Sequence, residues 1–227
     1  NMKAMDVMVR DVVTIGPEAD VRDAIKLLID NDVSALPVVD AGGMVVGIIS
    51  EADLVRREEI GTAKHRPWWL EAVTPAATLA EDFAKSHGKR VDEVMSTTII
   101  AASEETPLSE IAALLERHRI KRVPILRDGK LVGIVSRSNL IQALASARPA
   151  AAPAATGDSD RKIRDDLLTQ LAAQKWTDFG ARNIIVTDGV VHLWGLISSE
   201  EERKALIALT EDVAGVKSVS DEMIPAY

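Results

Sequence analysis

The sequence predicts an α+β fold: two tandem β-α-β-β-α repeats that form a pseudo-two-fold module, followed by a smaller α-β-β-α-β domain. The main observation is internal similarity, because segment 7–37 matches segment 94–124 at a constant offset of 87 residues. Each copy also changes from helical to strand-like hydrophobic spacing at corresponding points. Finally, an Ala/Pro-rich stretch at 148–157 separates the two copies from the C-terminal residues.

The first half of each repeat is expected to contain a short strand and then a helix. The apolar runs 12–15 and 99–102 predict the strands. Asp20 places a negative charge at the start of the first helix, and Thr106 is expected to cap the equivalent helix, with Pro107 at its first position. Helical spacing follows in both copies, at Val21, Ala24, Ile25 and Leu28 and at Leu108, Ile111, Leu114 and Leu115.

The second half of each repeat is expected to be a hairpin and a second helix. The predicted strands are 36–39 and 44–49 in the first copy and 123–126 and 131–135 in the second. The offset falls to 86 after the turn, where hairpins tolerate a change of length. Ser50 and Ser136 begin the second helices. A unit of about fifty residues cannot bury its sheet face alone, so the two copies should pack together.

The C-terminal residues predict a separate domain with a helix, a hairpin, a second helix and a last strand. The first helix has an apolar stripe at Ile163, Leu167, Leu168 and Leu171. The predicted strands are 184–187, 190–196 and 216–219. Ser199 and Glu202 predict a capping box at the start of the second helix, and Gly215 predicts its end. Trp194, in the hairpin, fits either a packed core or an exposed anchor.

Domain boundaries follow from these elements. They are 2–60 for the first repeat, 61–90 for a helical insert, 91–147 for the second repeat, 148–157 for a linker and 158–227 for the tail domain. The insert contains Trp68 and Trp69, which cannot both lie on one buried helix face. The two tryptophans either pack against the repeats or offer a docking site to a partner.

Composition disfavours several classes of function. Aromatic residues make up 3% of the chain, which argues against a deep aromatic pocket or a base-stacking platform. There is no cysteine, and the four histidines are not at metal-ligand spacing, so neither thiolate chemistry nor a metal site is expected. The net charge is −8, and no segment has the basic density of a nucleic-acid-binding protein. Because no apolar run reaches membrane-spanning length, we expect a cytoplasmic protein.

Each copy carries a serine three residues before a carboxylate or a carboxamide, at the start of its second helix. The first pair is Ser50 with Asp53, and the second is Ser136 with Asn139. One interpretation is structural: the serine caps the helix and its partner reaches back. The other is a ligand site, since a hydroxyl and backbone amides at a helix N-terminus suit a phosphate, and a carboxylate suits the hydroxyls of a ribose. Recurrence in tandem favours the ligand site.

These features resemble the cystathionine β-synthase (CBS) domain family, arranged as a tandem pair. The matching residues are Val7-Met8 and Val94-Met95, the turns 33–37 and 120–124 that end in proline, and the Gly-Ile-x-Ser-x-x-Asp/Asn motifs from Gly47 and Gly133. The resemblance implies clefts between the copies that bind adenine-containing ligands such as AMP, ATP, NAD(H) or S-adenosylmethionine. It also implies a homodimer that regulates an unknown partner protein.

The resemblance also assigns candidate ligand-binding residues by position. Asp53 would accept hydrogen bonds from ribose hydroxyls, and Ser50 would bind phosphate. Thr14 and the Ser34-Ala35-Leu36 segment would line the adenine pocket. The full set is Thr14, Ser34, Ala35, Leu36, Ile48, Ser50 and Asp53 in the first copy and Lys121, Arg122, Val123, Ile134, Ser136, Arg137 and Asn139 in the second. No residue is assigned a catalytic or metal-binding role.

The second copy departs from the family pattern. Asn139 stands where aspartate is usual, and Ala101 stands where the first copy has Thr14, so the second site is expected to be weaker or altered. Three cations also distinguish this copy, namely Lys121, Arg122 and Arg137. They either neutralise ligand phosphates, which favours a phosphorylated ligand, or form an exposed basic face.

The tail resembles, more weakly, the BON family, whose members are bacterial domains often linked to phospholipid or envelope association. The matching segments are 189–195 and 214–219. Residues 158–227 contain 8 basic and 13 acidic residues, a net charge of −5, so direct binding to anionic lipid is not expected. A role in binding a protein or a small ligand fits this composition better.

Two functional hypotheses result. The favoured one is a non-enzymatic regulatory sensor in which an adenine nucleotide binds between the repeats, and the dimer geometry or the tail domain relays its presence to a partner. The alternative is a structural adaptor or envelope-associated interaction protein with no nucleotide bound. An enzyme is not expected, because the sequence shows no histidine base for Ser50 and no carboxylate pair in a catalytic frame.

Overall fold

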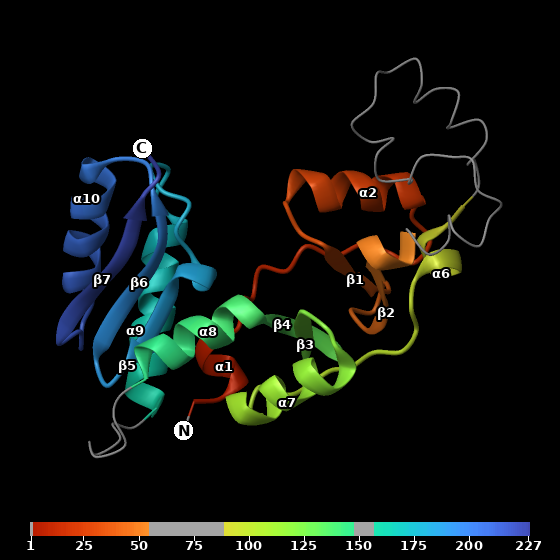
Figure 1. Cartoon of the computed structure of the whole chain (residues 1–227), viewed down its shortest axis with the longest axis horizontal. Coiled ribbons are helices and arrows are strands. Elements are labelled where there is room, and N and C mark those ends of the chain that lie inside the picture. The colour runs from red at the N-terminus through yellow and green to blue at the C-terminus, as the bar shows by residue number, and fades with distance from the viewer. Residues whose placement is uncertain (1, 55–88, 148–156) are drawn as a thin grey trace. The chain divides into compact units, whose positions relative to one another are not determined.

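The computed structural model describes residues 2–54, 89–147 and 157–227 (Figure 1). The chain divides into two compact units. The first-repeat unit comprises Asp11–Ile100 and Arg127–Leu131. The second-repeat unit comprises Asn1–Arg10, Ala101–Leu126 and Val132–Tyr227, so it contains the tail domain as well as most of the second repeat.

The first repeat folds as a helix, a hairpin and the start of a second helix. Its elements are α2 (Val21–Asp30), β1 (Ala35–Val39) and β2 (Val45–Ser50), and residues 51–54 begin its second helix. The short helix α6 (Val91–Val94), which opens the second repeat, packs into the same core. Asp20 caps α2 as predicted, because its side chain accepts a hydrogen bond of 2.8 Å from the Arg22 backbone amide. β1 and β2 pair antiparallel. The apolar stripe of α2 shares a core with Leu36, Val38 and Ile49 of this hairpin.

The second repeat has the same elements in the same order. They are α7 (Leu108–His118), β3 (Arg122–Arg127), β4 (Lys130–Ser136) and α8 (Arg137–Ser146). A short helix near the N-terminus, α1 (Ala4–Val7), packs into the core of this repeat. The core includes Ile111, Leu115, Val123, Ile125 and Val135. The hydrophobic spacing therefore predicts the helices and hairpins of both repeats correctly.

The first strand of each repeat is shorter than predicted. The run 12–15 forms only one bridge, in which Ile15 pairs parallel with Val38. The run 99–102 likewise forms one bridge, between Ala102 and Ile125. Each run pairs with the hairpin at a single residue before the chain turns toward the next helix, so a longer ladder does not form.

The predicted cap of α7 is wrong. Pro107 is the N-cap residue, no side chain caps this helix, and the first helical residue is Leu108. The Thr106 hydroxyl instead accepts a hydrogen bond of 3.0 Å from the Ser103 backbone amide. Thr106 therefore closes the preceding turn and lies one residue too early to cap the helix.

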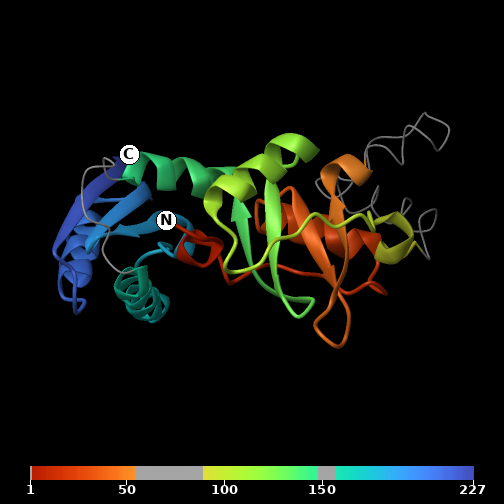
Figure 2. The ribbon, with the colours of Figure 1, turned by 90° about the horizontal axis from the view of Figure 1, so that it is seen from below.

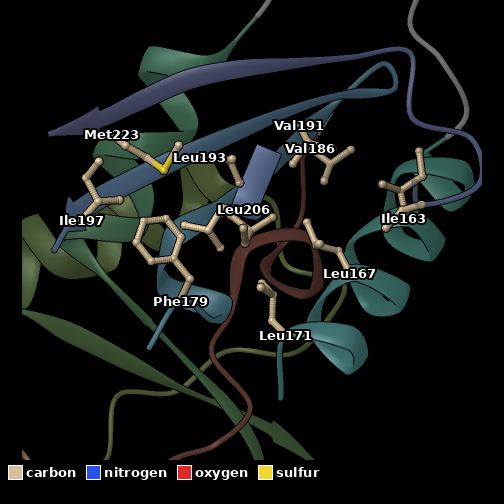
Figure 3. Close-up of a cluster of buried hydrophobic side chains, with 12 residues drawn as sticks. Ile163, Leu167, Leu171, Phe179, Val186, Val191, Leu193, Ile197, Leu206 and Met223 are labelled. Carbon is tan, nitrogen blue, oxygen red and sulfur yellow. The ribbon is translucent and has the colours of Figure 1, made fainter. Parts of the chain in front are cut away.

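The tail domain is a three-stranded sheet covered by two helices. Its elements are α9 (Gly157–Ala172), the short 3₁₀ helix η1 (Ala181–Asn183), β5 (Ile184–Thr187), β6 (Val190–Ile197), α10 (Glu200–Glu211) and β7 (Ser218–Pro225). The strand order is β5-β6-β7, with β5 antiparallel and β7 parallel to β6. Figure 3 shows Ile163, Leu167 and Leu171 of α9 directed toward the sheet residues of this core. The predicted α-β-β-α-β order is confirmed.

Three details of the tail correct the sequence prediction. Ser199 caps α10 by accepting from the Glu202 amide at 3.1 Å, but the Glu202 carboxylate accepts from the Ser198 amide and so does not complete the expected box. α10 ends at Glu211, before Gly215, because a further turn separates the helix from that glycine. The last strand begins at Ser218 and is longer than predicted, because it pairs with β6 along its whole length.

Several predictions fall outside the described residues. Trp68 and Trp69 lie there, together with most of the insert 61–90 and nearly all of the linker 148–157. Among the residues that are described, no helix is long and apolar enough to cross a membrane.

Candidate functional site

Each predicted motif lies on a strand that is extended by the opening segment of the other repeat. Val9, near the start of the first repeat, exchanges two backbone hydrogen bonds of 2.9 Å with Ile134 of β4. Ser96, near the start of the second repeat, exchanges backbone hydrogen bonds of 2.9 and 2.8 Å with Ile48 of β2. Both predicted isoleucines therefore lie in equivalent, cross-paired positions. The only sequence signal for Val9 and Ser96 is the duplicated Val-Met that precedes them.

The glycine of each motif makes room for this crossing segment. A Cβ atom on Gly133 would lie 2.7 Å from Met8 Sδ and 3.1 Å from the Val9 carbonyl oxygen. A Cβ atom on Gly47 would collide with the Met95 side chain in the same way. Glycine is therefore needed at these positions because a methionine lies directly over the strand.

In the first motif, the serine and the aspartate hydrogen-bond to each other. Asp53 Oδ2 accepts from the Ser50 amide at 3.0 Å and from the Ser50 hydroxyl at 2.9 Å. The Asp53 amide in turn donates to Ser50 Oγ at 3.2 Å. This arrangement is the reciprocal helix cap that the structural interpretation predicts.

The second motif repeats this geometry with an amide. Asn139 Oδ1 accepts from the Ser136 amide at 2.9 Å and from the Ser136 hydroxyl at 3.0 Å, and the Asn139 amide donates to Ser136 Oγ at 3.4 Å. Asn139 is 2% exposed, whereas Asp53 is only half-buried. The second motif is therefore both uncharged at this position and less accessible than the first.

The remaining candidates of the first repeat gather around the start of its second helix. The Ser34 carbonyl accepts from the Glu51 amide at 3.0 Å, which holds the start of this helix beside the entrance to β1. Ala35 is the register partner of Ser50. Leu36 is fully buried in the repeat core. A ligand would therefore contact its backbone more than its side chain.

Thr14 lies next to the same hairpin, because its neighbour Ile15 hydrogen-bonds to β1. The Ile15 amide donates to the Pro37 carbonyl at 3.1 Å, which fixes the extended segment next to β1. Thr14 itself is exposed. Ile48, on β2, is half-buried. The structure thus assembles the first-repeat candidates around one strand-to-helix junction.

The second-repeat candidates form an equivalent junction with more positive charge. The Lys121 carbonyl accepts from the Arg137 amide at 3.1 Å, matching the bond between Ser34 and Glu51. Lys121 and Arg137 have exposed side chains, Arg122 is half-buried, and Val123 is fully buried. Of the cations, Lys121 and Arg137 are thus the ones available to an anion from solvent.

The chemistry of both junctions is that of binding. Each presents a hydroxyl, backbone amides at a helix N-terminus and one carbonyl-type acceptor, which together suit phosphate and hydroxyl groups. Within the described part of the chain, no group of three or more metal-ligating side chains comes together. The residues that each junction brings together suit hydrogen bonding to a polar ligand.

The structure also reveals a buried arginine between the tail and the N-terminal segment. Arg164 of α9 is 2% exposed and donates to four backbone carbonyls. They belong to Ile184, Ala181, Met8 and Val7, at 3.1, 2.8, 3.2 and 3.3 Å. Burial lowers the pKa of Arg164 to about 10. An ion pair between Arg161 and Asp6 adds a second link between α9 and α1.

The end of α8 also contacts the tail. The Ser146 carbonyl accepts from the Thr187 hydroxyl at 3.2 Å, and the Ser146 hydroxyl accepts from Trp194 Nε1 at 3.0 Å. Ile185 is buried in the core cluster of the second repeat. Figure 2 shows α8, in green, reaching from the second repeat to the blue sheet of the tail. Trp194 is thus neither a tail-core residue nor a free anchor.

Sequence reasoning missed these contacts. Arg164 stands beside an apolar helical stripe, where an isolated cation is usually on the exposed face. Ile185 alternates with core residues of β5 and would face solvent in a sheet with one free side. The sequence signal for these contacts is the presence of an isoleucine and a tryptophan on the face of the sheet that is expected to be polar.

Two copies of one strand-to-helix junction, each completed by the opening segment of the other copy, define a tandem-repeat module with a small domain attached. The chain belongs to the CBS domain family, whose model matches residues 4–59 and 91–146. The model of the BON domain matches residues 159–224. Both resemblances predicted from the sequence are confirmed, in the predicted order.

Curated relatives match the repeat pair. Protein MJ1426 of Methanocaldococcus jannaschii is 32% identical over 154 residues, which cover 63% of this chain and 91% of the relative. CBS domain-containing protein CBSX2, chloroplastic, of Arabidopsis thaliana is 30% identical over 135 residues, and the match covers 57% of each chain. Inosine-5'-monophosphate dehydrogenase of Methanocaldococcus jannaschii is 27% identical over 141 residues, but that match covers only 23% of the enzyme.

Solved structures share the fold of the repeat pair. The CBS domain of a membrane protein from Sphaerobacter thermophilus has a TM-score of 0.50 and 28% identity, covering 62% of this chain and 86% of that one. CBSX2 in complex with AMP has a TM-score of 0.50 and 27% identity, covering 64% and 97%. The α+β fold class predicted from the sequence is therefore confirmed.

Proposed function

We propose that this protein is a non-enzymatic sensor whose repeat pair binds an adenine nucleotide of the AMP class. The observation that carries the proposal is the recurrence, in both repeats, of one junction that combines a serine hydroxyl, helix N-terminal amides and an acceptor side chain. A similar chain, CBSX2, has been crystallised with AMP. The same binding chemistry would also serve ATP, NAD(H) or S-adenosylmethionine, which compete with AMP in the test.

The first junction is the stronger candidate for the ribose. Asp53 carries a full charge and is half-buried, so a hydrogen bond from a ribose hydroxyl to it is charge-assisted. The Ser50 hydroxyl and the backbone amides that follow it would bind the phosphate. Thr14 and the segment from Ser34 to Leu36 would pack against the adenine. At the second junction, Asn139 is neutral and nearly inaccessible, while Lys121 and Arg137 supply positive charge for a phosphate.

The tail domain would relay occupancy of the second junction. α8 begins at the Ser136–Asn139 motif and ends at Ser146, which two tail side chains hold. A second route runs from Ile134 to Val9, directly after the carbonyls held by Arg164. A ligand that shifts the start of α8 would therefore change the contacts at its end. Coupling of this kind needs different ligand affinities in the docked and undocked arrangements of the tail.

Isothermal titration of the full chain with AMP tests the binding. We expect saturable heat that Asp53→Ala greatly weakens and that Asn139→Ala changes less. Asp23→Ala, an exposed aspartate of α2, is the matched control and should bind as the unchanged chain does. No heat and no change in melting temperature with AMP, ATP, NADH or S-adenosylmethionine would falsify the proposal.

Hydrogen exchange tests the relay. With AMP bound, we expect altered protection at the end of α8, in β5 and in α9. Trp194→Leu, which removes the bond to Ser146, should change the AMP affinity because coupling is reciprocal. Trp176→Leu is the matched control, since Trp176 is exposed and bonds only to Gln174. Identical AMP affinities for all three proteins, with unchanged protection, would leave the tail without a role in sensing.

The adaptor hypothesis has one observation in its favour. Ser50 with Asp53, and Ser136 with Asn139, already form complete helix caps, so both motifs have a structural purpose without a ligand. An adaptor predicts that nucleotides leave the melting temperature unchanged. It also predicts that capture of a partner from a lysate depends on the tail domain alone.

A further inference from the structure

The tail sheet carries an exposed apolar pair on the face opposite its two helices. Leu196 of β6 and Ile224 of β7 are register partners, and they are 65% and 61% exposed. Their neighbours Ile197 and Met223 are buried in the tail core together with residues of α9 and α10. Because side chains alternate along a strand, Leu196 and Ile224 lie on the outer face of the sheet. This outer-face pair forms one apolar surface across the two strands.

Other residues of the outer face already contact the second repeat. Trp194, two residues before Leu196, donates to the Ser146 hydroxyl at 3.0 Å and packs on the core of that repeat. Ile185 of β5 is fully buried in the same core. A sheet face that meets water is normally polar. The outer-face pair instead continues, in exposed form, the apolar surface with which this sheet contacts the second repeat.

The unpaired charges near the outer-face pair are acidic. Glu222 is exposed, lies on the same face two residues before Ile224, and takes part in no ion pair among the described residues. Its carboxylate accepts a hydrogen bond of 3.1 Å from the Ser220 hydroxyl. Glu201 is exposed where α10 begins, shortly after β6. The nearby cation Arg203 is already paired with two other carboxylates. Charge complementarity therefore favours a cationic partner.

The free edge of β7 is poorly suited to an added strand. The Ala226 amide donates to the Ile197 carbonyl at 2.9 Å, so alternate residues of β7 face β6 and those between them face the free edge. At this edge the Met223 amide donates to Asp221 Oδ1 at 2.9 Å, and Pro225 has no amide. An extended peptide would lack these donors. The structure therefore favours a partner that lies across the outer face.

We propose that the outer-face pair is the docking site for a basic amphipathic helix of a partner protein. The apolar stripe of that helix would cover Leu196 and Ile224, and its lysines or arginines would pair with Glu222 and Glu201. A helix presents both stripes side by side and does not use the strand edge. Acidic residues around the pair disfavour an anionic lipid surface. The inference rests on the proposed role of the tail in contacting a partner, but it does not require a bound nucleotide.

Fluorescence anisotropy of labelled synthetic helices with the full chain tests the docking. One helix combines leucine with lysine, and its match has glutamate at every lysine position. We expect saturable binding of the lysine helix and at least about tenfold weaker binding of the glutamate helix. Leu196→Ser/Ile224→Ser should weaken binding of the lysine helix by a similar factor, because the apolar contact is lost. Glu222→Lys should weaken it as well, because the charge beside the pair is reversed.

Two control variants separate docking from general attraction to an acidic protein. Ile141→Ser/Leu144→Ser removes an apolar pair of α8 that is 65% and 77% exposed. Glu211→Lys reverses an exposed charge at the other end of α10. Both variants should bind the lysine helix as the unchanged chain does. Circular dichroism checks that every variant is folded.

Several outcomes would overturn the proposal. The lysine helix could fail to bind saturably, or the glutamate helix could bind equally well. Leu196→Ser/Ile224→Ser could bind as the unchanged chain does, or lose no more affinity than the control pair. Vesicles of phosphatidylglycerol are the last arm, because flotation of the chain with them that this variant abolishes would assign the outer face to a lipid surface. All measurements are made without nucleotide, so they do not depend on AMP binding.

Discussion

Arg164 shows how much one side chain contributes to the junction between the second repeat and the tail. Its guanidinium lies among four carbonyls and has no carboxylate within hydrogen-bond distance among the described residues. Burial lowers the pKa of Arg164 to about 10, which still leaves it protonated at neutral pH. The carbonyls that accept from it come from the tail and from the chain ahead of Val9. The arginine therefore links two segments that the sequence places far apart.

Replacement of this side chain should destabilise the protein. In Arg164→Met, four buried carbonyls lose a charged donor while most of the side-chain volume is kept. We expect the free energy of unfolding, measured in urea, to fall by about 2–4 kcal/mol. Arg182→Met, an exposed arginine of η1, is the control and should stay within about 0.5 kcal/mol. Equal stability of the two variants would show that the buried cation contributes nothing net.

His192 predicts a pH dependence at the same interface. Its Nε2 lies 2.9 Å from the Thr187 hydroxyl, and burial lowers its pKa below 6.5, with Glu222 acting in the opposite direction. In the unfolded chain His192 then binds a proton more readily than in the folded one. The free energy of unfolding should therefore fall as pH drops below 6.5.

The matched variant isolates this contribution. His192→Gln keeps a group that can donate to Thr187 but does not titrate. Denaturation of both proteins across the mildly acidic range should show a smaller loss of stability in the variant. A loss of equal size in both would mean that another group is responsible.

At the scale of elements, each hairpin depends on the opening segment of the other repeat. Val9 and Ser96 extend β4 and β2, and Met8 and Met95 lie over the motif glycines. This pattern explains why the Gly-Ile motif and the Val-Met pair occur together. It also joins each candidate ligand site to chain outside its own repeat.

A methyl group on the motif glycine tests this arrangement. In Gly133→Ala the new Cβ would meet Met8 and the Val9 carbonyl, so one of the two segments has to move. We expect a loss of about 1–3 kcal/mol in the free energy of unfolding. Gly180→Ala, where an added Cβ meets nothing within 4 Å, is the control. If Gly133→Ala left the free energy of unfolding unchanged, the segment with Met8 and Val9 would be loosely held.

The sequence predicts local elements better than their partners. Periodicity places α2, α7, α9 and the hairpins because each depends on residues a few positions apart. It also predicts the serine caps at Ser50 and Ser136. It does not predict that Val9 pairs with Ile134, because a backbone pairing between distant segments leaves no local pattern. The tail contacts of Arg164 and Ile185 escape prediction for the same reason.

At the scale of the whole molecule, duplication followed by divergence explains the proposed sensor. The repeats keep one fold and one motif, but they differ at Asp53 against Asn139. Different junctions suit unequal binding. Most of the second repeat and the tail belong to one compact unit, so the proposed relay concerns the second junction.

Ligand binding should raise the stability of the whole chain. A ligand present at a hundred times its Kd stabilises the folded state by about 2.7 kcal/mol. We therefore expect AMP to raise the melting temperature in a concentration-dependent way and adenine-free ribose phosphate to have less effect. Asp53→Ala should remove most of the shift. A melting temperature that ribose phosphate and AMP raise equally would indicate an anion site without adenine recognition.

Equilibrium dialysis of the full chain against labelled AMP tests the central claim most directly. It measures bound nucleotide itself, and competition with ATP, NADH and S-adenosylmethionine ranks the ligand class. The account predicts saturable uptake that falls strongly in Asp53→Ala and remains unchanged in Asp23→Ala. Uptake that never exceeds the free concentration, or that Asp53→Ala leaves intact, would contradict it.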